Sequence, residues 1–396
     1  MAGGSPVALS RRAAALDGDS ISILTSEKRV LSARPTTGWL RARYHFIDDP
    51  RPHDPPHSVD DLHGSPSEPR AIRGDLPVIS PALRLSRDAM HLSSRRNAVY
   101  QRALAIIADE RPDIILATSD DGVFLIAAYQ AARATKTPFF VMLFDIYAGN
   151  NYSWIKRSIA RVYEGRILRA AEAVFVTNTA TRDHYRRLYQ IDSVVIEHPS
   201  PAHGAVEARP AISQPVIAYT GSVYWAQRDA LQALVGALGK LASVRLRIVS
   251  DASQGVLRRQ GVWSDQVSLI HSELLGVEQQ QHQADILYLP LGFGNRAHDV
   301  IRTAAPGKLA EYLVAGVPIL VHAPSFSYIA RDAREHGWGF VVDTADRVSL
   351  ARGIERLLND LELRRSLVRN AVTIAGSRHA ASRTREQLRK GLGLDL

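Results

Sequence analysis

The chain has 396 residues, which is long for a single hydrophobic core and favours two domains. With 45% hydrophobic and 22% charged residues it has a globular composition, and the absence of cysteine excludes disulfides and thiolate metal sites. The formal net charge of +9, carried mostly by arginine, indicates an anionic partner such as a phosphorylated substrate, an anionic lipid or a nucleic acid.

The first half of the sequence alternates between short apolar runs and segments with helical periodicity. A strand is expected at 21–25, and the proline-rich stretch 50–77 is expected to be a loop. Further strands are predicted at 113–118, 138–144, 173–177 and 194–196, with helices at 95–110, 121–132, 153–171 and 180–188. Strands that alternate with helices indicate a doubly wound parallel sheet.

Residues 199–215 form the clearest boundary, because they contain four prolines and no periodicity. We therefore expect an N-terminal domain at 1–200, a linker at 201–215, a second domain at 216–378, and a closing helix at 379–396 that packs back on the first domain. The second domain repeats the alternation. Its predicted strands are 216–220, 244–249, 266–270, 285–289, 317–321 and 339–342, and its helices are 229–238, 276–283, 328–336, 348–358 and 361–375, with a flexible loop at 291–302.

The stretch 306–321 combines a short helix with a buried strand. Pro306 suits a first helical position, and Gly316 suits a helix end. The start of such a helix offers N–H groups to an anion, Lys308 adds a positive charge, and Glu311 can accept hydrogen bonds from two neighbouring hydroxyls. This layout suits a nucleoside diphosphate, although an ordinary capped helix of an α/β domain would show the same residues.

Several motifs occur together in a fixed order along the chain. They are Phe144-Asp145, AAEAVFVT at 170–177, VIEHP at 195–199, AYTGS at 218–222, ADILYLPL at 284–291 and KLAEYLVAGVP at 308–318. In this order they resemble a GT-B glycosyltransferase, most closely the retaining family 4, or group 1, type. The resemblance implies an α/β fold with two Rossmann-like, doubly wound parallel sheets that face a central cleft.

The resemblance also implies a donor site in the second domain. Glu311 would bind the ribose hydroxyls, Lys308 and Arg228 would stabilise charge on the leaving diphosphate, and Asp145 is the candidate for a polar catalytic or acceptor-contacting group, although it could equally be a loop carboxylate or helix cap. The remaining nucleotide-sugar contacts would come from Gly221, Ser222, Arg302, Thr303, Pro306, Gly307 and Leu309.

Three features depart from the family pattern. Thr303 stands eight positions before Glu311, where the family often has an acidic residue that contacts the sugar. No clear equivalent of the family's first-domain histidine is evident. Gly3-Gly4 is not preceded by a strand, so we expect the usual first strand to be absent.

The function implied is transfer of a sugar, with retention, from a UDP- or GDP-sugar to a hydroxyl, in surface polysaccharide or glycolipid synthesis. No cofactor, metal or nucleic acid is expected, because the acidic pairs 48–49 and 120–121 read as solvated and no stacking motif is present. An inactive GT-B partner subunit and a GT-B nucleotide-sugar epimerase remain alternatives.

The segment 152–169 mixes aromatic and aliphatic residues with lysine and arginine. A basic amphipathic helix of this kind can rest on an anionic membrane, although an ordinary surface helix is the other reading. No run approaches the ~20 apolar residues of a spanning helix, and no signal peptide is evident. We therefore expect a cytoplasmic protein, peripheral on the inner face of the cell membrane, whose acceptor is a glycan or is lipid-linked.

Overall fold

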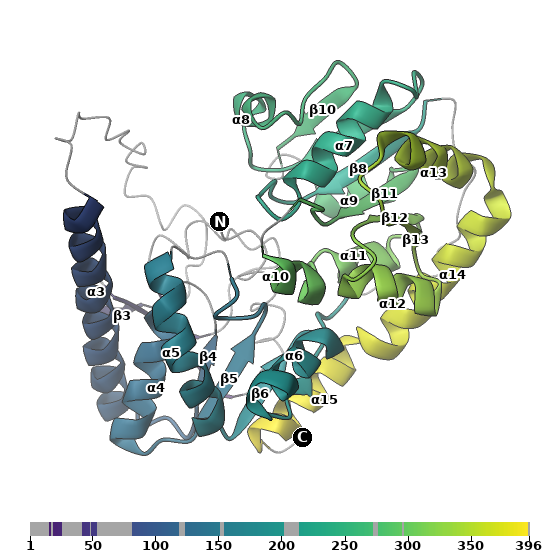
Figure 1. Ribbon diagram of the computed structural model, residues 1–396. Coiled ribbons are helices and arrows are strands. Elements are labelled where there is room, and N and C mark those ends of the chain that lie inside the picture. Colours follow the sequence, from purple (N-terminus) through teal and green to yellow (C-terminus); the bar gives the residue numbers. More distant parts are fainter. Residues whose placement is uncertain are drawn as a thin grey trace.

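The computed structural model describes residues 16, 19–25, 42–47, 49–53, 81–118, 123–150, 154–201, 214–271, 276–294 and 297–394. These residues form two α/β lobes (Figure 1), each built on a parallel sheet. Among the described residues, no helix is both long enough and apolar enough to cross a bilayer.

The first lobe is organised around four parallel strands with the order β4-β5-β6-β7. Every residue of β5 is buried, as expected for a central strand of a parallel sheet. Helices α4 and α5 follow β4 and β5, and α3 packs on α4. The strands are β4 (Ile115–Thr118), β5 (Phe139–Leu143), β6 (Ala173–Val176) and β7 (Val194–Val195), and the helices are α3 (Pro81–Glu110), α4 (Val123–Thr135), α5 (Trp154–Ala170) and α6 (Thr179–Tyr189).

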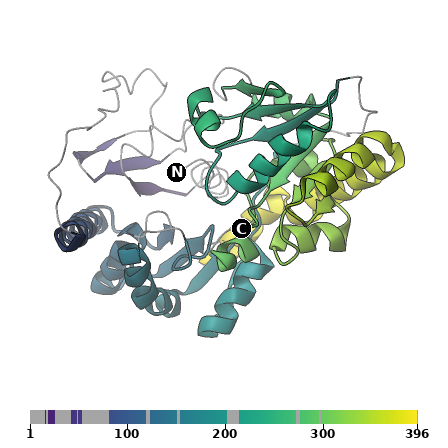
Figure 2. The same ribbon diagram turned by 45° about the horizontal axis from the view of Figure 1, so that its top comes forward.

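A separate three-stranded sheet lies beside α3 (Figure 2) and contains β1 (Ser22–Thr25), β2 (Arg43–Phe46) and β3 (Asp49–His53). The loop expected at 50–77 is therefore wrong at 50–53, where β3 pairs antiparallel with β2. Strand β3 contains two prolines, which are tolerated because an edge strand needs fewer backbone donors. The predicted absence of a first strand concerns residues before Gly3, which lie outside the described residues.

The second lobe contains six parallel strands with the order β10-β9-β8-β11-β12-β13. The order reverses between β8 and β11, and open α/β sheets bind ligands at the carboxyl ends of the strands beside such a reversal. The strands are β8 (Val216–Thr220), β9 (Arg245–Val249), β10 (Val267–Ile270), β11 (Ile286–Pro290), β12 (Ile319–His322) and β13 (Phe340–Val342). The helices of this lobe are α7 (Arg228–Leu238), α8 (Gln254–Arg259), α9 (Val277–His282), α10 (His298–Thr303), α11 (Leu309–Val314), α12 (Tyr328–His336), α13 (Arg347–Asn359) and α14 (Leu361–Arg378).

Helix α10 joins the two lobes and corrects the expectation of a flexible loop at 291–302. Its Val300 packs in the core of the first lobe, whereas Ile301 packs in the core of the second. The Thr303 carbonyl accepts a hydrogen bond of 2.9 Å from Nδ2 of Asn178, whose own Oδ1 caps α6. The helix therefore owes its order to contacts with the other lobe, which a local reading cannot see.

The chain crosses between the lobes a second time after α14. Helix α15 (Ala381–Leu392) returns to the first lobe, where Leu388 and Leu392 pack against Phe140 and Phe175. A cluster of aromatic and aliphatic side chains from β5, β6 and α15 thus forms one core. The structure places this last helix in the first lobe.

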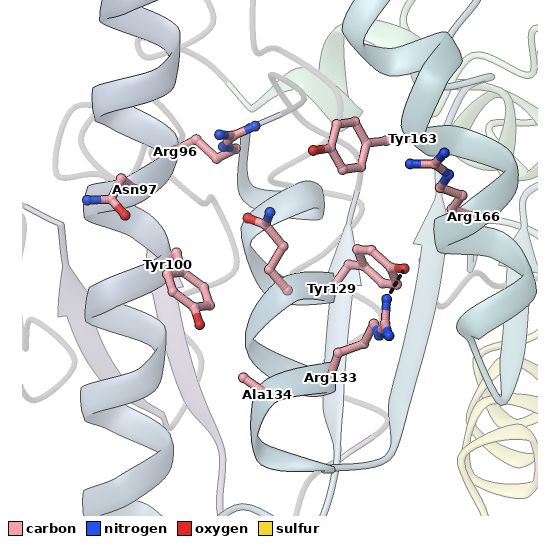
Figure 3. A pocket seen from close by; sticks show the side chains of 9 residues that line it. Arg96, Asn97, Tyr100, Tyr129, Arg133, Ala134, Tyr163 and Arg166 are labelled. Atoms are coloured by element: carbon pink, nitrogen blue, oxygen red, sulfur yellow. Dashed lines mark hydrogen bonds between the residues drawn. The ribbon is translucent and has the colours of Figure 1, made fainter.

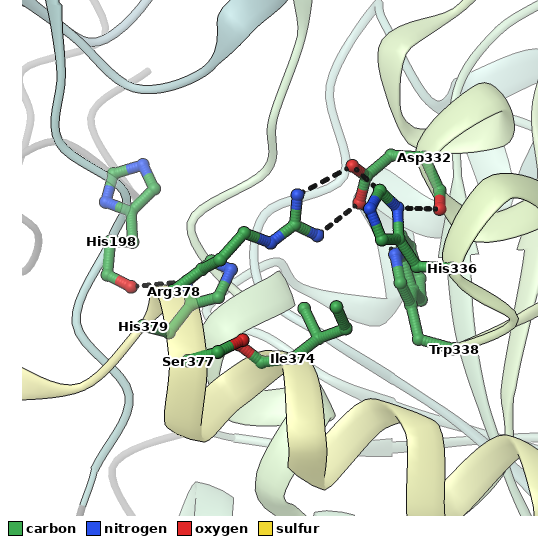
Figure 4. A network of polar contacts seen from close by, with 8 residues as sticks. All are labelled: His198, Asp332, His336, Trp338, Ile374, Ser377, Arg378 and His379. Atoms are coloured by element: carbon green, nitrogen blue, oxygen red, sulfur yellow. Dashed lines mark hydrogen bonds and ion pairs between the residues drawn. The ribbon is translucent and has the colours of Figure 1, made fainter.

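The two crossings touch each other at His379. The Ser200 amide donates to the His379 carbonyl at 2.8 Å, and Nδ1 of His379 lies 2.7 Å from the His198 carbonyl. The preceding residue, Arg378, forms two hydrogen bonds to the carboxylate of Asp332, at 2.9 and 2.8 Å, and Nε1 of Trp338 donates to the same carboxylate at 2.7 Å (Figure 4). These contacts hold the end of α14 on the second lobe.

Candidate active site

The loops that follow β8 and α10 meet at the carboxyl edge of the second sheet. The hydroxyl of Tyr312 accepts hydrogen bonds from the amide and the hydroxyl of Thr220, at 3.0 and 3.2 Å. Nε2 of Gln281 donates to Thr220 Oγ1 at 3.2 Å and to Glu311 Oε2 at 3.0 Å. These hydrogen bonds connect helices α9 and α11 to the end of β8. They hold the Glu311 carboxylate where the three elements meet.

Lys308 is the most perturbed cation of this region. Its Nζ is buried, has no hydrogen-bond partner among the described residues, and lies 3.7 Å from the centre of the Tyr219 ring. Burial lowers the pKa of Lys308 to about 7, although the Glu311 carboxylate acts in the opposite direction. An unpartnered buried ammonium is costly, and an incoming anion would satisfy it.

Two glycine turns leave room beside this ammonium. A Cβ on Gly221, which has φ of 110°, would lie 3.3 Å from Lys308 Nζ, so a side chain there would crowd the cation and strain the backbone. The amides of Ser222, Gly307 and Lys308 have no protein acceptor among the described residues. The amide of Gly221, in contrast, donates to the Val249 carbonyl at 2.8 Å and serves the sheet.

The ring under Lys308 is itself fixed in place. The Tyr219 hydroxyl lies 2.6 Å from the Ser222 carbonyl and contacts Oε1 of Gln227. Gln227 is buried at the start of α7, so the residue that follows it, Arg228, is brought to the same end of the sheet, where its side chain is exposed. The structure therefore brings Gly221, Lys308 and the start of α7 together.

The loop after β11 is fastened to α7 by one carboxylate. Oδ2 of Asp229 accepts hydrogen bonds from the amides of Phe293 and Gly294, at 2.8 and 2.7 Å. A Cβ on Gly292 would lie 2.5 Å from Oδ1 of Asp229, so a side chain there would displace this carboxylate. Sequence reasoning had treated this segment as flexible, and its order depends on a partner more than 60 residues away.

The first lobe contributes Asp145, which lies two residues after the end of β5. It is exposed to solvent, yet the protein around it removes enough water to raise the pKa of its carboxyl. Its charge also contributes, after burial, to the raised pKa of the Tyr224 phenol, which belongs to the second lobe. Asp145 therefore faces the second lobe across the space between the two sheets.

A buried glutamate positions the loop that carries Asp145. Oε1 of Glu164 accepts from the Ala148 amide at 2.8 Å and from the Tyr185 hydroxyl at 3.2 Å, while Oε2 accepts from Tyr189 at 2.6 Å. The Tyr185 hydroxyl in turn accepts from the Tyr147 amide at 2.9 Å. One carboxylate of α5 and two tyrosines of α6 thus fix the segment after Asp145.

His198 is a site residue that sequence reasoning missed. Its ring stacks on Phe144, with centroids 6.0 Å apart, and its Cε1 would lie 4.0 Å from a Cβ built on Gly307. A histidine at the end of the first lobe therefore approaches the turn that precedes α11, whereas the sequence had offered no clear equivalent of the family's first-domain histidine. Its position after a strand of a parallel sheet was the available signal, but only the assembled lobes show what it faces.

Other predicted site residues have structural contacts. The Thr303 side chain is buried, and its hydroxyl donates to the Asp299 carbonyl of its own helix at 2.8 Å, so it does not point to a ligand. The guanidinium of Arg302 lies 5.3 Å from the Phe326 ring centre, Leu309 is buried in the core, and Pro306 accepts from the Leu309 amide at 2.9 Å. The helix thus starts at Leu309 and not at Pro306, which begins the turn before it.

Metal ligands do not gather in the part of the chain that the structure describes, where no group of three or more His, Asp or Glu side chains is placed to hold an ion.

Comparison with known proteins agrees with this architecture. The model of the glycosyl transferase 4-like domain matches residues 10–198, and the model of the glycosyl transferases group 1 matches residues 214–360. No curated protein matches the chain.

Three solved structures illustrate the likeness in fold. The structure of S. aureus MnaA with UDP is 14% identical, with 99% of this chain and 94% of that chain covered at a TM-score of 0.56. Anabaena Alr3699/HepE in complex with UDP is 17% identical, with coverages of 75% and 82% and a TM-score of 0.55. CalG4, the calicheamicin glycosyltransferase, is 14% identical, with coverages of 98% and 94% and a TM-score of 0.50. Together with the two domain models, the fold shows that the chain belongs to the group 1 glycosyltransferases of GT-B architecture.

Proposed function

We propose that this protein transfers a sugar from a nucleoside diphosphate sugar, with UDP or GDP as the nucleotide, to a hydroxyl of a glycan or lipid-linked acceptor. The observation that carries the proposal is the buried Lys308 ammonium, which lacks a hydrogen-bond partner among the described residues and lies beside the unpartnered amides of Gly307 and Ser222. A diphosphate supplies the negative charge and the acceptor oxygens that these groups need.

In the proposed reaction the protein acts mainly through fixed charges and dipoles. Lys308, the neighbouring amides and Arg228 stabilise the charge that develops on the diphosphate as the bond to the sugar breaks. With retention, the leaving phosphate oxygen takes the proton from the acceptor hydroxyl on the same face of the sugar, so no strong protein base is needed. Asp145 contacts the acceptor from the first lobe, and no divalent metal is required.

The Glu311 carboxylate is proposed to bind the two ribose hydroxyls. Replacing Glu311 with alanine should raise the dissociation constant of UDP or GDP about tenfold or more, because hydrogen bonds to a charged acceptor are lost. A thermal-shift screen over nucleoside diphosphates measures this, with Glu355→Ala on the exposed face of α13 as the matched control. An unchanged shift in the Glu311 variant contradicts the ribose role.

One observation favours an inactive partner subunit as a second candidate. Thr303, which replaces the family's acidic residue, is bound within its own helix and leaves the sugar end of the site without that carboxylate. Incubation with a panel of nucleotide sugars separates the two proposals, because an enzyme transfers sugar to an acceptor or slowly hydrolyses the donor. Nucleotide binding without any turnover supports the inactive partner.

We further propose that α5 rests on the inner face of the cell membrane, where the protein would build surface polysaccharide or glycolipid. Trp154 is 61% exposed and Val162 is 59% exposed, and both lie among arginines on one helix. The protein should pellet with anionic liposomes at low salt and dissociate at high salt.

Trp154→Ala should weaken this liposome binding severalfold, because an aromatic anchor is removed from the interface. Leu188→Ala, at a position that is 55% exposed on α6, is the matched control. If the protein does not bind anionic liposomes at low salt, the membrane proposal fails.

A further inference from the structure

A pocket lies in the first lobe, between α3, α4 and α5 (Figure 3), and has a volume of about 730 Å³. Its side chains come from positions one helical turn apart, such as Arg96 and Tyr100 on α3 or Tyr129 and Arg133 on α4. Three helix faces therefore line one recess.

This pocket is separate from the candidate active site. Helix α4 runs back from the carboxyl edge of β4, so Arg133 in its last turn lies toward the amino edge of the sheet. Asp145 and the lobe boundary lie at the opposite, carboxyl edge. Occupation of the pocket therefore does not require the donor site to be filled.

The charge of the pocket is entirely positive. Arg96, Arg133 and Arg166 line it, and the remaining lining residues are tyrosine, asparagine, glutamine and alanine, with no carboxylate. Among the described residues, neither Arg96 nor Arg166 forms an ion pair, whereas elsewhere on the chain several arginines pair with aspartate or glutamate. Three guanidinium groups around one recess whose lining holds no carboxylate indicate an anionic ligand.

The tyrosines narrow the class of that ligand. Tyr100, Tyr129 and Tyr163 line the same recess, and Arg133 lies over the Tyr129 ring at 5.8 Å and donates to its hydroxyl at 3.3 Å. Aromatic faces with hydroxyl edges suit the apolar faces and hydroxyls of sugar rings, whereas a lone phosphate or sulfate needs no aromatic wall. A recess of this volume also exceeds the needs of a single anion.

We propose that this pocket binds an anionic oligosaccharide, whose carboxylate, sulfate or phosphate groups pair with the arginines while its rings pack on the tyrosines. The pocket would hold a charged glycan chain at a point distant from the end of the glycan that reacts. It requires only the α3–α4–α5 surface, so it stands whether or not the protein transfers sugar.

The test uses the full chain without nucleotide and measures binding of three tetrasaccharides by calorimetry: sulfated heparin tetrasaccharide, tetragalacturonate and neutral maltotetraose. At least one of the two charged glycans should bind and the neutral glycan should not. The double variant Arg96→Gln/Arg166→Gln should weaken charged-glycan binding by at least about tenfold. Melting temperature and the UDP-induced thermal shift should stay unchanged, which shows that the fold and the donor site are intact.

The matched control is Arg161→Gln/Arg187→Gln, which removes the same charge from exposed positions outside the pocket. A second variant, Tyr100→Ala, should weaken glycan binding. The proposal is overturned if neither charged glycan binds, or if the control weakens binding as much as the pocket variant does. Binding only of inorganic phosphate, or only of phosphatidylglycerol vesicles, also overturns it.

Discussion

Replacement of Lys308 with methionine is expected to weaken UDP or GDP binding about 100-fold and, at the same time, to make the ligand-free protein more stable. Methionine keeps the aliphatic volume over the Tyr219 ring but removes the ammonium that pairs with the diphosphate, and charge-assisted hydrogen bonds are the stronger class. Calorimetric titration with the nucleotide measures the first effect, and thermal unfolding measures the second.

The gain in stability should depend on pH. The unfolded chain binds a proton at Lys308 below about pH 10.4, whereas the pKa of Lys308 in the folded protein is lowered to about 7 by burial. Between these pH values the unfolded state holds more protons, so wild-type stability rises with pH in this range. The methionine variant should lack this component of the slope.

The affinity for the nucleotide should fall with rising pH, whereas the stability of the ligand-free protein rises. The diphosphate favours the charged amine, so binding takes up a proton above about pH 7, and wild-type affinity should decrease from there upward. Lys240→Met, at an exposed position at the end of α7, should change neither property. Unchanged UDP affinity in the Lys308 variant would remove the main support for the donor site.

Replacement of Asp332 with alanine is expected to lower the free energy of unfolding by about 3–5 kcal/mol. The carboxylate is buried, and its loss leaves the Arg378 guanidinium and the Trp338 N–H without their acceptor. Urea denaturation measures the change. Asp183→Ala, which removes an exposed ion pair with Arg182, should cost less than about 1 kcal/mol.

The pair of Asp332 and Arg378 should also make the free energy of unfolding depend on pH. Burial acts to raise the pKa of Asp332, but the hydrogen bonds from Arg378 and Trp338 outweigh it and lower the pKa. A lowered folded-state pKa contributes stability above the unfolded value of about 3.9, and this contribution is lost as the pH falls below it. The alanine variant should lack that acid-side loss, and a double-mutant cycle with Arg378→Met should show coupling. Additive effects of the two substitutions would show that the contact stabilises little.

Local patterns predicted the regular elements well. Helix α12 was expected at 328–336 and occupies Tyr328–His336, and most strands differ from their predicted bounds by one or two residues. Buried parallel strands are continuous apolar runs, which need no distant information to recognise. Helix α8 was not predicted, and α3 begins at Pro81, well before the predicted start at residue 95.

The parts of the site that depend on both lobes were beyond the sequence. Lys308, Gly221 and Glu311 lie close in one lobe, and their grouping was predicted from one motif and one turn. The order of α10 and the position of His198 were not predicted, because each depends on a residue more than 100 positions away: Asn178 binds the Thr303 carbonyl, and Gly307 lies near the His198 ring. Contacts between the lobes are set by partners that local patterns do not reveal.

The return of α15 to the first lobe has a consequence for synthesis on the ribosome. Strands β5 and β6 emerge long before residues 381–392, yet their cluster is completed by Leu388 and Leu392. The second lobe, whose strands and helices lie between residues 216 and 378, has all its elements available earlier. The lobe that is translated first is therefore completed last, and until then Phe140 and Phe175 lack the cover of α15 on the nascent chain.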